Sequence, residues 1–138
     1  MKYILESPIV GRIGQQKFKT SIIWRNGAFI TDEPEKIGGQ DLGPDPYSLL
    51  LSSLVACTLA TLRLYIDHKT LEIKDITVEA NMYQKIVKEQ IVTYIDRSIT
   101  FDEAVAPEIK QRLLKIAESC PVSKILKGNV EIATQLPS

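Results

Sequence analysis

The stretch that decides the fold spans residues 45–68 and reads DPYSLLLSSLVACTLATLRLYIDH. Asp45 can accept backbone N–H bonds as the N-cap of a helix, and Pro46 suits the first helical position, where its missing N–H costs nothing. The body from Tyr47 to about His68 is apolar on nearly every side, so the sequence predicts a long helix that must be covered all round. A wrapping sheet or a second subunit would provide that cover.

The same helix is the one segment of the sequence that is apolar enough to be compared with a membrane span. The uncharged part runs over residues 48–62, which is shorter than the roughly 20 apolar residues that a bilayer crossing needs. It also carries four hydroxyl side chains, and Arg63 ends it. A buried helix of a globular protein explains the stretch better, and we expect no membrane association.

Composition narrows the class of protein further. The chain has 44% hydrophobic and 25% charged residues, as ordinary soluble domains do, and its 17 basic residues balance its 17 acidic ones. No basic stripe with aromatic residues appears, so a nucleic-acid partner is not expected. The N-terminus reaches Glu6 before a signal-peptide core could develop. We therefore expect a cytoplasmic protein with one domain over residues 1–138.

The flanking segments predict a mixed α/β (α+β) fold. Residues 16–24 and 28–31 form strands around a two-residue turn at Asn26-Gly27, residues 3–10 add a strand before a turn at 11–14, and residues 32–46 are a loop. Residues 71–101 alternate enough for two or three antiparallel strands. A helix follows Pro107 to about residue 119, then a short helix over 121–127 and a last strand over 130–134.

The chain has only two cysteines, Cys57 and Cys120, and a single histidine, His68. A zinc site usually requires more ligands than two cysteines and one histidine, and no other metal or cofactor motif appears in the sequence. A structural disulfide is not expected in a reducing cytosol. The two thiols are therefore either inert buried side chains or a redox pair, and the residues alone leave both interpretations open.

The two cysteines differ in local context. Cys120 precedes Pro121, which suits a first helical position and places Cys120 at the N-cap, where the helix favours a thiolate. Cys57 lies in the middle of an apolar helix, where burial normally keeps a thiol inert. His68 lies about 16 Å further along the helix axis, and Arg63 points about 240° away around it. An activating cation for Cys57 must therefore come from elsewhere in the fold or from another chain.

Several short motifs are specific when they are taken together. Residues 38–47 read GGQDLGPDPY, LLL follows at 49–51, ACT at 56–58, TLRLY at 61–65, and CPV at 120–122. This order of motifs, which extends over essentially the whole chain, resembles the OsmC/Ohr family and its OsmC-like branch. The resemblance implies an intertwined homodimer, in which curved antiparallel sheets surround the long central cysteine-bearing helices.

The resemblance also implies a function. Members of this kind are thiol-dependent peroxidases of the oxidative stress response, which reduce organic hydroperoxides and, as a second substrate class, hydrogen peroxide. It implies that Cys57 is the peroxidatic thiol and Cys120 the resolving thiol, with no bound cofactor. An external dithiol then reduces the disulfide, and in the Ohr branch this reductant is a lipoylated protein.

Further site residues follow from the resemblance. Family members use an arginine near the start of the chain to hold the thiolate, and Arg12 occupies the matching place, with Arg25 as the local competitor. A glutamate that orients this arginine is replaced here by Tyr47. Glu33, Asp41 and Asp45 are candidate substitutes from the loop, although Asp45 is already explained as the helix cap. Ser123 stands where many relatives have histidine. Tyr47, Glu33 and Ser123 are therefore candidate pocket residues.

Two other functions remain open at this point. A binding or sensing protein could use Cys57 and an apolar interface pocket to hold a small thiol or a hydrophobic ligand. An acyl- or sulfur-transferring enzyme would need Cys57 but not Cys120, and no base for it is evident. Only the peroxidase requires both cysteines and a disulfide during turnover.

Overall fold

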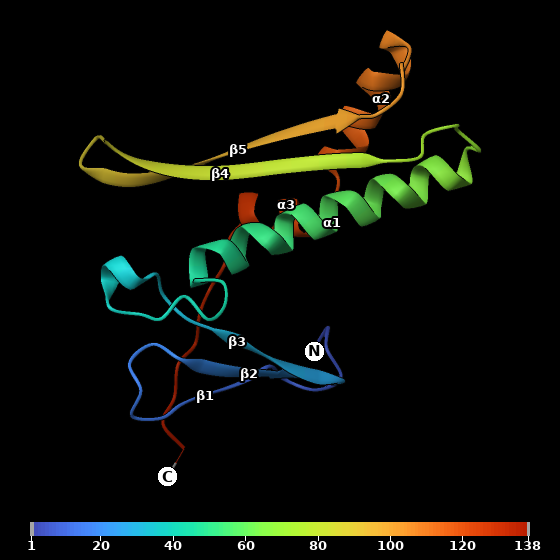
Figure 1. Cartoon of the computed structure of the whole chain (residues 1–138). Coiled ribbons are helices and arrows are strands. Elements are labelled where there is room, and N and C mark those ends of the chain that lie inside the picture. Colours follow the sequence, from blue (N-terminus) through green and yellow to red (C-terminus); the bar gives the residue numbers. More distant parts are fainter. Residues whose placement is uncertain (1, 138) are drawn as a thin grey trace. The chain divides into compact units, whose positions relative to one another are not determined.

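The computed structural model describes residues 2–137 and divides the chain into two compact units (Figure 1). The first unit runs up to Leu50 and contains a three-stranded sheet, a loop and the start of a long helix. The second unit begins at Leu51 and contains the rest of that helix, a two-stranded ribbon and two further helices. The mixed α/β class predicted from the sequence is confirmed, and the single domain stays a prediction.

The sheet of the first unit has the antiparallel order β1 (Val10–Ile13), β2 (Thr20–Trp24) and β3 (Gly27–Thr31). The predicted hairpin is confirmed, but its turn consists of residues 25 and 26, and Gly27 already pairs with Trp24. A Cβ atom on Gly27 would lie 3.2 Å from Nε1 of Trp24. A larger residue at position 27 would press on the Trp24 indole, which would have to shift by a few tenths of an ångström to admit it.

Strand β1 corrects two predictions. Residues 11–14 were expected to form a turn, but Gly11 to Ile13 are strand, and Arg12 pairs with Ser21 of β2. Residues 3–9, predicted to be a strand, have no regular structure. They contain Pro8, which lacks the N–H that a ladder needs, whereas β1 finds a complete partner in β2.

The predicted loop after β3 is confirmed, and it is built around a buried carboxylate. Asp32 accepts backbone N–H bonds from Glu33 (2.8 Å), Gln40 (3.2 Å) and Leu42 (3.3 Å). Burial by itself raises the pKa of Asp32, but these three bonds, with the positive charge of Lys19, hold it below its ordinary value. Asp32 therefore organises the loop as an anion.

Two close approaches of the backbone tighten this loop, which also contains the short 3₁₀ helix η1 (Glu35–Ile37). A Cβ atom on Gly39 would lie 1.9 Å from the carbonyl oxygen of Glu33, and one on Gly43 would lie 2.0 Å from that of Ile30. Neither distance allows a side chain, so both glycines are required by packing.

The long helix α1 (Pro46–His68) forms as predicted. The Asp45 carboxylate accepts the N–H of Tyr47 at 3.1 Å and also the hydroxyl proton of Ser48, which confirms the N-cap. Every fourth residue is buried in a single stripe: Leu54, Thr58, Leu62 and Ile66. The opposite side is open, since Leu64 is 74% exposed. By length and composition α1 could also cross a membrane, a property shared with core helices of soluble proteins.

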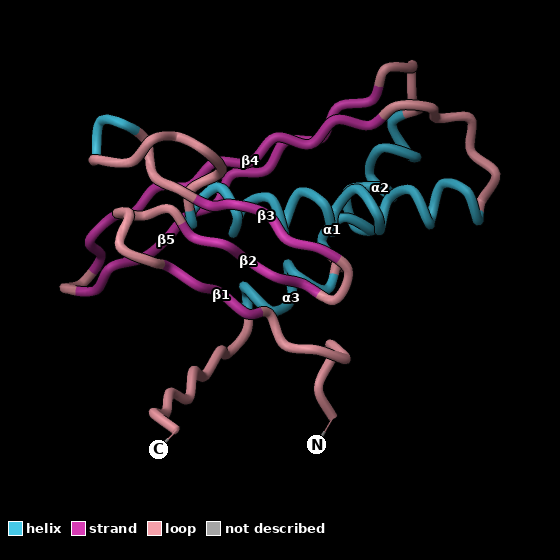
Figure 2. Tube along the Cα trace, turned by 60° about the horizontal axis from the view of Figure 1, so that its bottom comes forward, coloured by secondary structure: helices cyan, strands magenta, loops and turns pink. Residues whose placement is uncertain are grey.

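The ribbon of the second unit pairs β4 (Ile76–Val87) with β5 (Gln90–Phe101) along their full length, as Figure 2 shows. Of the two or three strands predicted, two are present. Lys88 and Glu89 form the turn with φ values of 50° and 66°. Positive φ at both central residues is typical of the type I′ turn, which suits the twist of a hairpin.

Helices α2 (Pro107–Glu118) and α3 (Pro121–Lys127) complete the second unit as predicted. The main core lies where α1 and α2 meet, and its buried members are Leu62, Ile66, Ile73, Leu113 and Ala117. The last strand, predicted over 130–134, is absent: no described residue after Gly128 has regular structure, and Ile132 is 86% exposed. A strand needs a pairing partner, and no strand within residues 2–137 pairs with this segment.

Candidate functional site

Cys120 is the N-cap of α3, as predicted. Its backbone is extended and its Sγ atom accepts the N–H of Ser123 at 3.4 Å. The residue is fully buried, and the Ser123 hydroxyl lies 2.9 Å from Sγ. Ser123, a predicted pocket residue, is thus the immediate neighbour of one thiol.

Cys57 lies on α1, close enough to Cys120 for its side chain to help lower the pKa of that thiol. It is partly exposed, whereas Cys120 is not, and neither cysteine is in a disulfide. The neighbouring hydroxyl of Thr58 lies 3.8 Å from Cys120 Sγ. Two thiols that are 63 positions apart in the sequence are therefore neighbours in the second unit.

A third element brings a cation to this pair. Arg97 of β5 donates through Nη1 to Ser123 Oγ at 2.7 Å, to Thr58 Oγ1 at 2.9 Å and to Cys120 Sγ at 3.8 Å. Arg97 is not among the site residues predicted from the sequence. Its signal was the alternation of β5, in which Arg97 takes an inward position between Ile95 and Ile99. An arginine at such a position needs polar partners inside the protein.

The guanidinium of Arg97 is itself held by acidic and basic neighbours. Its Nη2 atom lies 3.7 Å from Oε2 of Glu118, the last residue of α2, and Lys127 of α3 binds the same oxygen. The pKa of Glu118 is lowered mainly by its hydrogen bond from Lys127, with help from both positive charges and against the effect of burial. The Arg97 side chain is only 12% exposed, so its charge acts inside the protein.

These contacts change the acidity of Cys120. Burial raises the pKa of this thiol, but hydrogen bonds from the Ser123 hydroxyl and N–H, from Thr58 and from Cys57 outweigh it. The net effect lowers the pKa from 9.0 to about 7. A substantial fraction of Cys120 is then thiolate, the nucleophilic form, at neutral pH.

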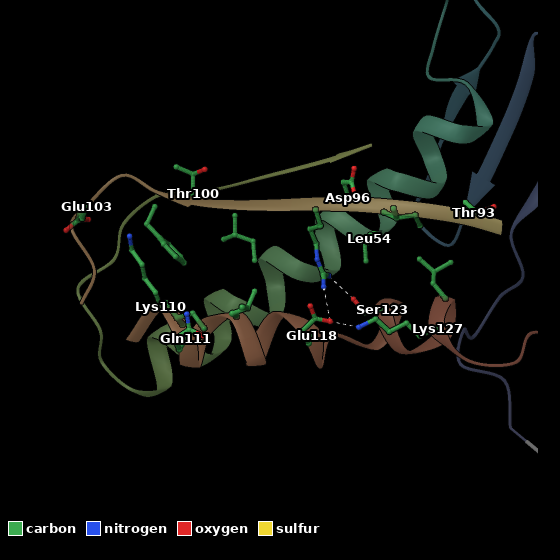
Figure 3. Close-up of a pocket in the computed structure, with 17 residues that line it drawn as sticks. Leu54, Thr93, Asp96, Thr100, Glu103, Lys110, Gln111, Glu118, Ser123 and Lys127 are labelled. Atoms are coloured by element: carbon green, nitrogen blue, oxygen red, sulfur yellow. Dashed lines mark hydrogen bonds and ion pairs between the residues drawn. The ribbon is translucent and has the colours of Figure 1, made fainter. Parts of the chain in front are cut away.

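Arg97 and Ser123, which contact Cys120, also line a cavity of about 780 Å³, whereas neither cysteine is among its lining residues. Figure 3 shows Leu54 and Ser123 toward its middle, with Glu103 and Lys110 at one end and Thr93 at the other. Its apolar lining comes from α1, β5, α2 and α3 and includes Leu54, Ile95, Ile99, Phe101, Leu113 and Leu126. This mixture of an apolar wall and a few convergent polar groups is typical of sites for small molecules.

The other predicted site residues belong to the first unit. Arg12 is exposed in β1, Glu33 lies partly buried in the loop, and Tyr47 is 70% exposed at the start of α1. Their contribution to the cysteine pair stays a prediction. Within residues 2–137, no group of three or more histidine, cysteine or acidic side chains could hold a metal ion.

His68 and Arg63, the basic residues near the end of α1, lie away from Cys57, as expected from the helix geometry. His68 is exposed at the last position of the helix. Arg63 donates to the carbonyl of Ile73 at 3.0 Å and to Asp67 at 3.3 Å. Its guanidinium is therefore engaged at the end of the helix and not at Cys57.

Solved structures with the same fold come from several bacteria. One from Psychrobacter arcticus 273-4 matches with a TM-score of 0.71 and 23% identity, over 91% of this chain and 90% of the other. An OsmC-like protein from Mycoplasma pneumoniae gives 0.68 and 20%, over 91% and 90%. The organic hydroperoxide resistance protein OhrB of Bacillus subtilis gives 0.65 and 21%, over 94% and 96%. At such identities the likeness establishes the fold alone.

Sequence comparison gives the family. A search of curated proteins found no match. The family described as OsmC-like protein, in contrast, matches residues 38–135, which include both cysteines, Arg97 and Ser123. That match covers well over half of the chain and agrees with the resemblance carried by the GGQDLGPDPY and CPV motifs. The chain belongs to the OsmC-like protein family.

Proposed function

We propose that this protein is a thiol-dependent peroxidase that reduces organic hydroperoxides, and hydrogen peroxide as a second substrate, through Cys57 and Cys120. The observation that carries the proposal is the meeting of the two thiols beside Arg97, where hydrogen bonds lower the pKa of Cys120. A role in peroxide metabolism agrees with the family and with the organic hydroperoxide resistance proteins among the solved structures.

The proposed cycle has two chemical steps before reduction. The Cys57 thiolate attacks the O–O bond of the peroxide, an S–O bond forms, and the leaving alkoxide takes a proton to become the alcohol. The Cys120 thiolate then attacks the sulfur of the Cys57 sulfenic acid. The S–O bond breaks, hydroxide leaves as water after protonation, and a disulfide joins the two cysteines.

Substrate binding is assigned to two features. Arg12 is proposed to hold the Cys57 thiolate and the peroxide oxygen, because its guanidinium is always protonated and donates in a fixed fork. Glu33 and Tyr47 are proposed to border this part of the site in place of the family's glutamate. The apolar wall around Leu54 suits an organic group on the peroxide better than a hydroxyl group.

An external dithiol is proposed to reopen the disulfide, since no described residue supplies a third thiol. A lipoylated protein is the candidate donor, because two thiols on one carrier can complete the exchange without a second collision. No bound cofactor is needed for this cycle.

We also propose that the active form is a homodimer. The face of α1 opposite the buried stripe, together with large exposed apolar residues elsewhere in the second unit, needs cover. These residues include Leu64, Ile86, Ile91 and Ile132. A second copy of the chain would cover them and would also supply a partner for the unpaired segment over 130–134.

Intact-mass spectrometry of the fully reduced protein, after one equivalent of cumene hydroperoxide, tests the cycle. The parent should lose about two mass units as the disulfide forms, and Cys120→Ser should instead yield a sulfenic acid that dimedone traps on Cys57. Cys57→Ser serves as the matched control and should leave the peroxide unconsumed. If both thiols stay reduced while the peroxide persists, the peroxidase proposal fails, and the cavity should be tested as a ligand-binding site.

A further inference from the structure

The two thiols of the pair have unequal environments. Cys120 is fully buried, receives a hydrogen bond from Arg97 of β5 and contacts the Thr58 hydroxyl of α1, whereas Cys57 is partly exposed. An attacking molecule from solution therefore reaches Cys57 more easily. A negative charge, in contrast, is better held on Cys120. Access and charge stabilisation are thus divided between the two sulfur atoms.

The direction of the hydrogen bonds makes this division sharper. A guanidinium has no acceptor, so Arg97 must donate to Ser123 Oγ across the 2.7 Å contact. The single hydroxyl proton of Ser123 is then free to point at Cys120 Sγ, 2.9 Å away. The positive charge of Arg97 polarises that hydroxyl and makes it a stronger donor to an anion. Arg97 also donates directly to the sulfur at 3.8 Å.

We propose that Arg97, acting directly and through Ser123, holds Cys120 as the leaving thiolate when the reductant reopens the disulfide, so that the reductant always attacks Cys57. This inference rests on the proposed peroxidase function and adds the direction of its last step. Arg97 is thereby assigned as a thiolate-stabilising residue that no motif in the sequence marks.

The step balances as an ordinary thiol–disulfide exchange. A thiolate of the external dithiol attacks Cys57 Sγ, a new S–S bond forms between them, and the old bond to Cys120 breaks. The electron pair of that bond stays on Cys120 Sγ, and Ser123 and Arg97 stabilise the resulting negative charge by donating hydrogen bonds to the sulfur. The second thiol of the reductant then attacks the mixed disulfide and releases Cys57, so that the dithiol is oxidised and both cysteines are reduced.

Rates of this exchange depend on the leaving thiol, because a thiol of lower pKa leaves faster. The charged groups around Cys120 set that property. Arg97 faces it from β5, while Glu118 of α2 binds the far side of the guanidinium and Lys127 of α3 neutralises Glu118. From α1, Cys57 contributes a hydrogen bond. Among the described residues, the charged group in contact with the sulfur is therefore the positive guanidinium of Arg97.

Thiolate absorbance at 240 nm, followed against pH in a Cys57→Ser background, measures the first consequence. Arg97→Met should raise the pH of half-titration of Cys120 by about one unit, a tenfold loss of thiolate at neutral pH. Arg97→Lys should recover part of it, and Arg112→Met, which removes an exposed arginine of α2, should change nothing. A shift below about 0.2 units in Arg97→Met and in Ser123→Ala would overturn the proposal.

The direction of attack is tested on protein oxidised with diamide, which forms the disulfide whether or not the protein reacts with peroxides. A limiting amount of glutathione is added, the products are quenched in acid, and peptide mass spectrometry locates the mixed disulfide. We expect it on Cys57 in the parent and on both cysteines in Arg97→Met. Glutathione on Cys120 of the parent would refute the inference while leaving the peroxidase proposal to its own test.

Discussion

Two buried anionic groups of this molecule are held in different ways. Asp32, in the first unit, is surrounded by backbone N–H groups of its own loop, the most distant only ten residues along the chain. Cys120, in the second unit, depends on side chains from α1, β5 and α3, and its partner Thr58 is 62 residues away. The first arrangement is local and made of main chain, and the second is distant and made of side chains.

The comparison explains what each anion can do. A backbone donor cannot be removed by most substitutions, so the charge on Asp32 is fixed and serves the loop's structure. Side-chain donors can be changed one at a time and respond to charges such as Glu118. The acidity of Cys120 is therefore adjustable, which is what a reactive group requires.

The largest effect should come from crowding the loop around Asp32. Gly39→Ala would put a Cβ atom 1.9 Å from the carbonyl oxygen of Glu33 and 2.9 Å from Oδ1 of Asp32. The backbone must move to admit it, and we expect a loss of about 3 kcal/mol of unfolding free energy. Urea denaturation measures it, with Gly14→Ala as the control, because nothing lies within 4 Å of that position.

If Gly39→Ala and Gly14→Ala unfold at the same urea concentration, the loop is not the rigid main-chain cage described for Asp32. Asp32 would then not differ from Cys120 in being held by a rigid main-chain environment.

An intermediate effect should appear in the pH dependence of the reduced protein. The pKa of Cys120 is lower in the folded state, about 7, than its ordinary value of 9.0, so the folded protein releases this proton first. Stability should therefore rise between pH 7 and 9 and be lost as the pH falls through 7, by on the order of 2 kcal/mol after solvent screening.

Urea unfolding of the parent and of Cys120→Ser, at one protein concentration under strong reductant, isolates this contribution. The stability difference between the two proteins should grow toward pH 9. Parallel pH profiles would mean that the thiolate gains nothing from the fold, and that Cys120 is as fixed in its chemistry as Asp32.

The smallest effect should come from Glu118. This carboxylate lies 3.7 Å from Arg97 and offsets part of its positive charge. Glu118→Gln should therefore lower the pKa of Cys120 by a few tenths of a unit, as expected for a half-exposed charge. Titration at 240 nm in the Cys57→Ser background detects it, and Glu108→Gln, in the exposed first turn of α2, is the matched control. A rise would show that Glu118 positions Arg97 and does not compete with it.

Local signals explain what the sequence could predict. The N-caps at Asp45 and Cys120, and the helices that follow them, depend on neighbouring residues and were predicted almost to the residue. The two cysteines were identified from the family motifs, and their proximity in space followed from the fold implied by the family.

Distant pairing explains what the sequence could not predict. Strand β1 exists because β2 pairs with it. The segment over 130–134 is not a strand, because none of the strands in the described part of the chain pairs with it. Arg97 was missed for the same reason, since its polar partners Thr58, Cys120, Ser123 and Glu118 all lie on other elements or at their caps. Only the break that it makes in the apolar alternation of β5 could have drawn attention to it.

Arg97 has a further consequence for how this chain can evolve. One guanidinium ties β5 to α1 through Thr58, to α2 through Glu118 and to α3 through Ser123. Selection for correct folding and selection for thiol reactivity would thus act on the same side chain. A descendant that lost both cysteines would still need this arginine, or a simultaneous change of all three partners. Arg97 would then be retained for structural reasons in descendants that no longer carry out the cysteine chemistry.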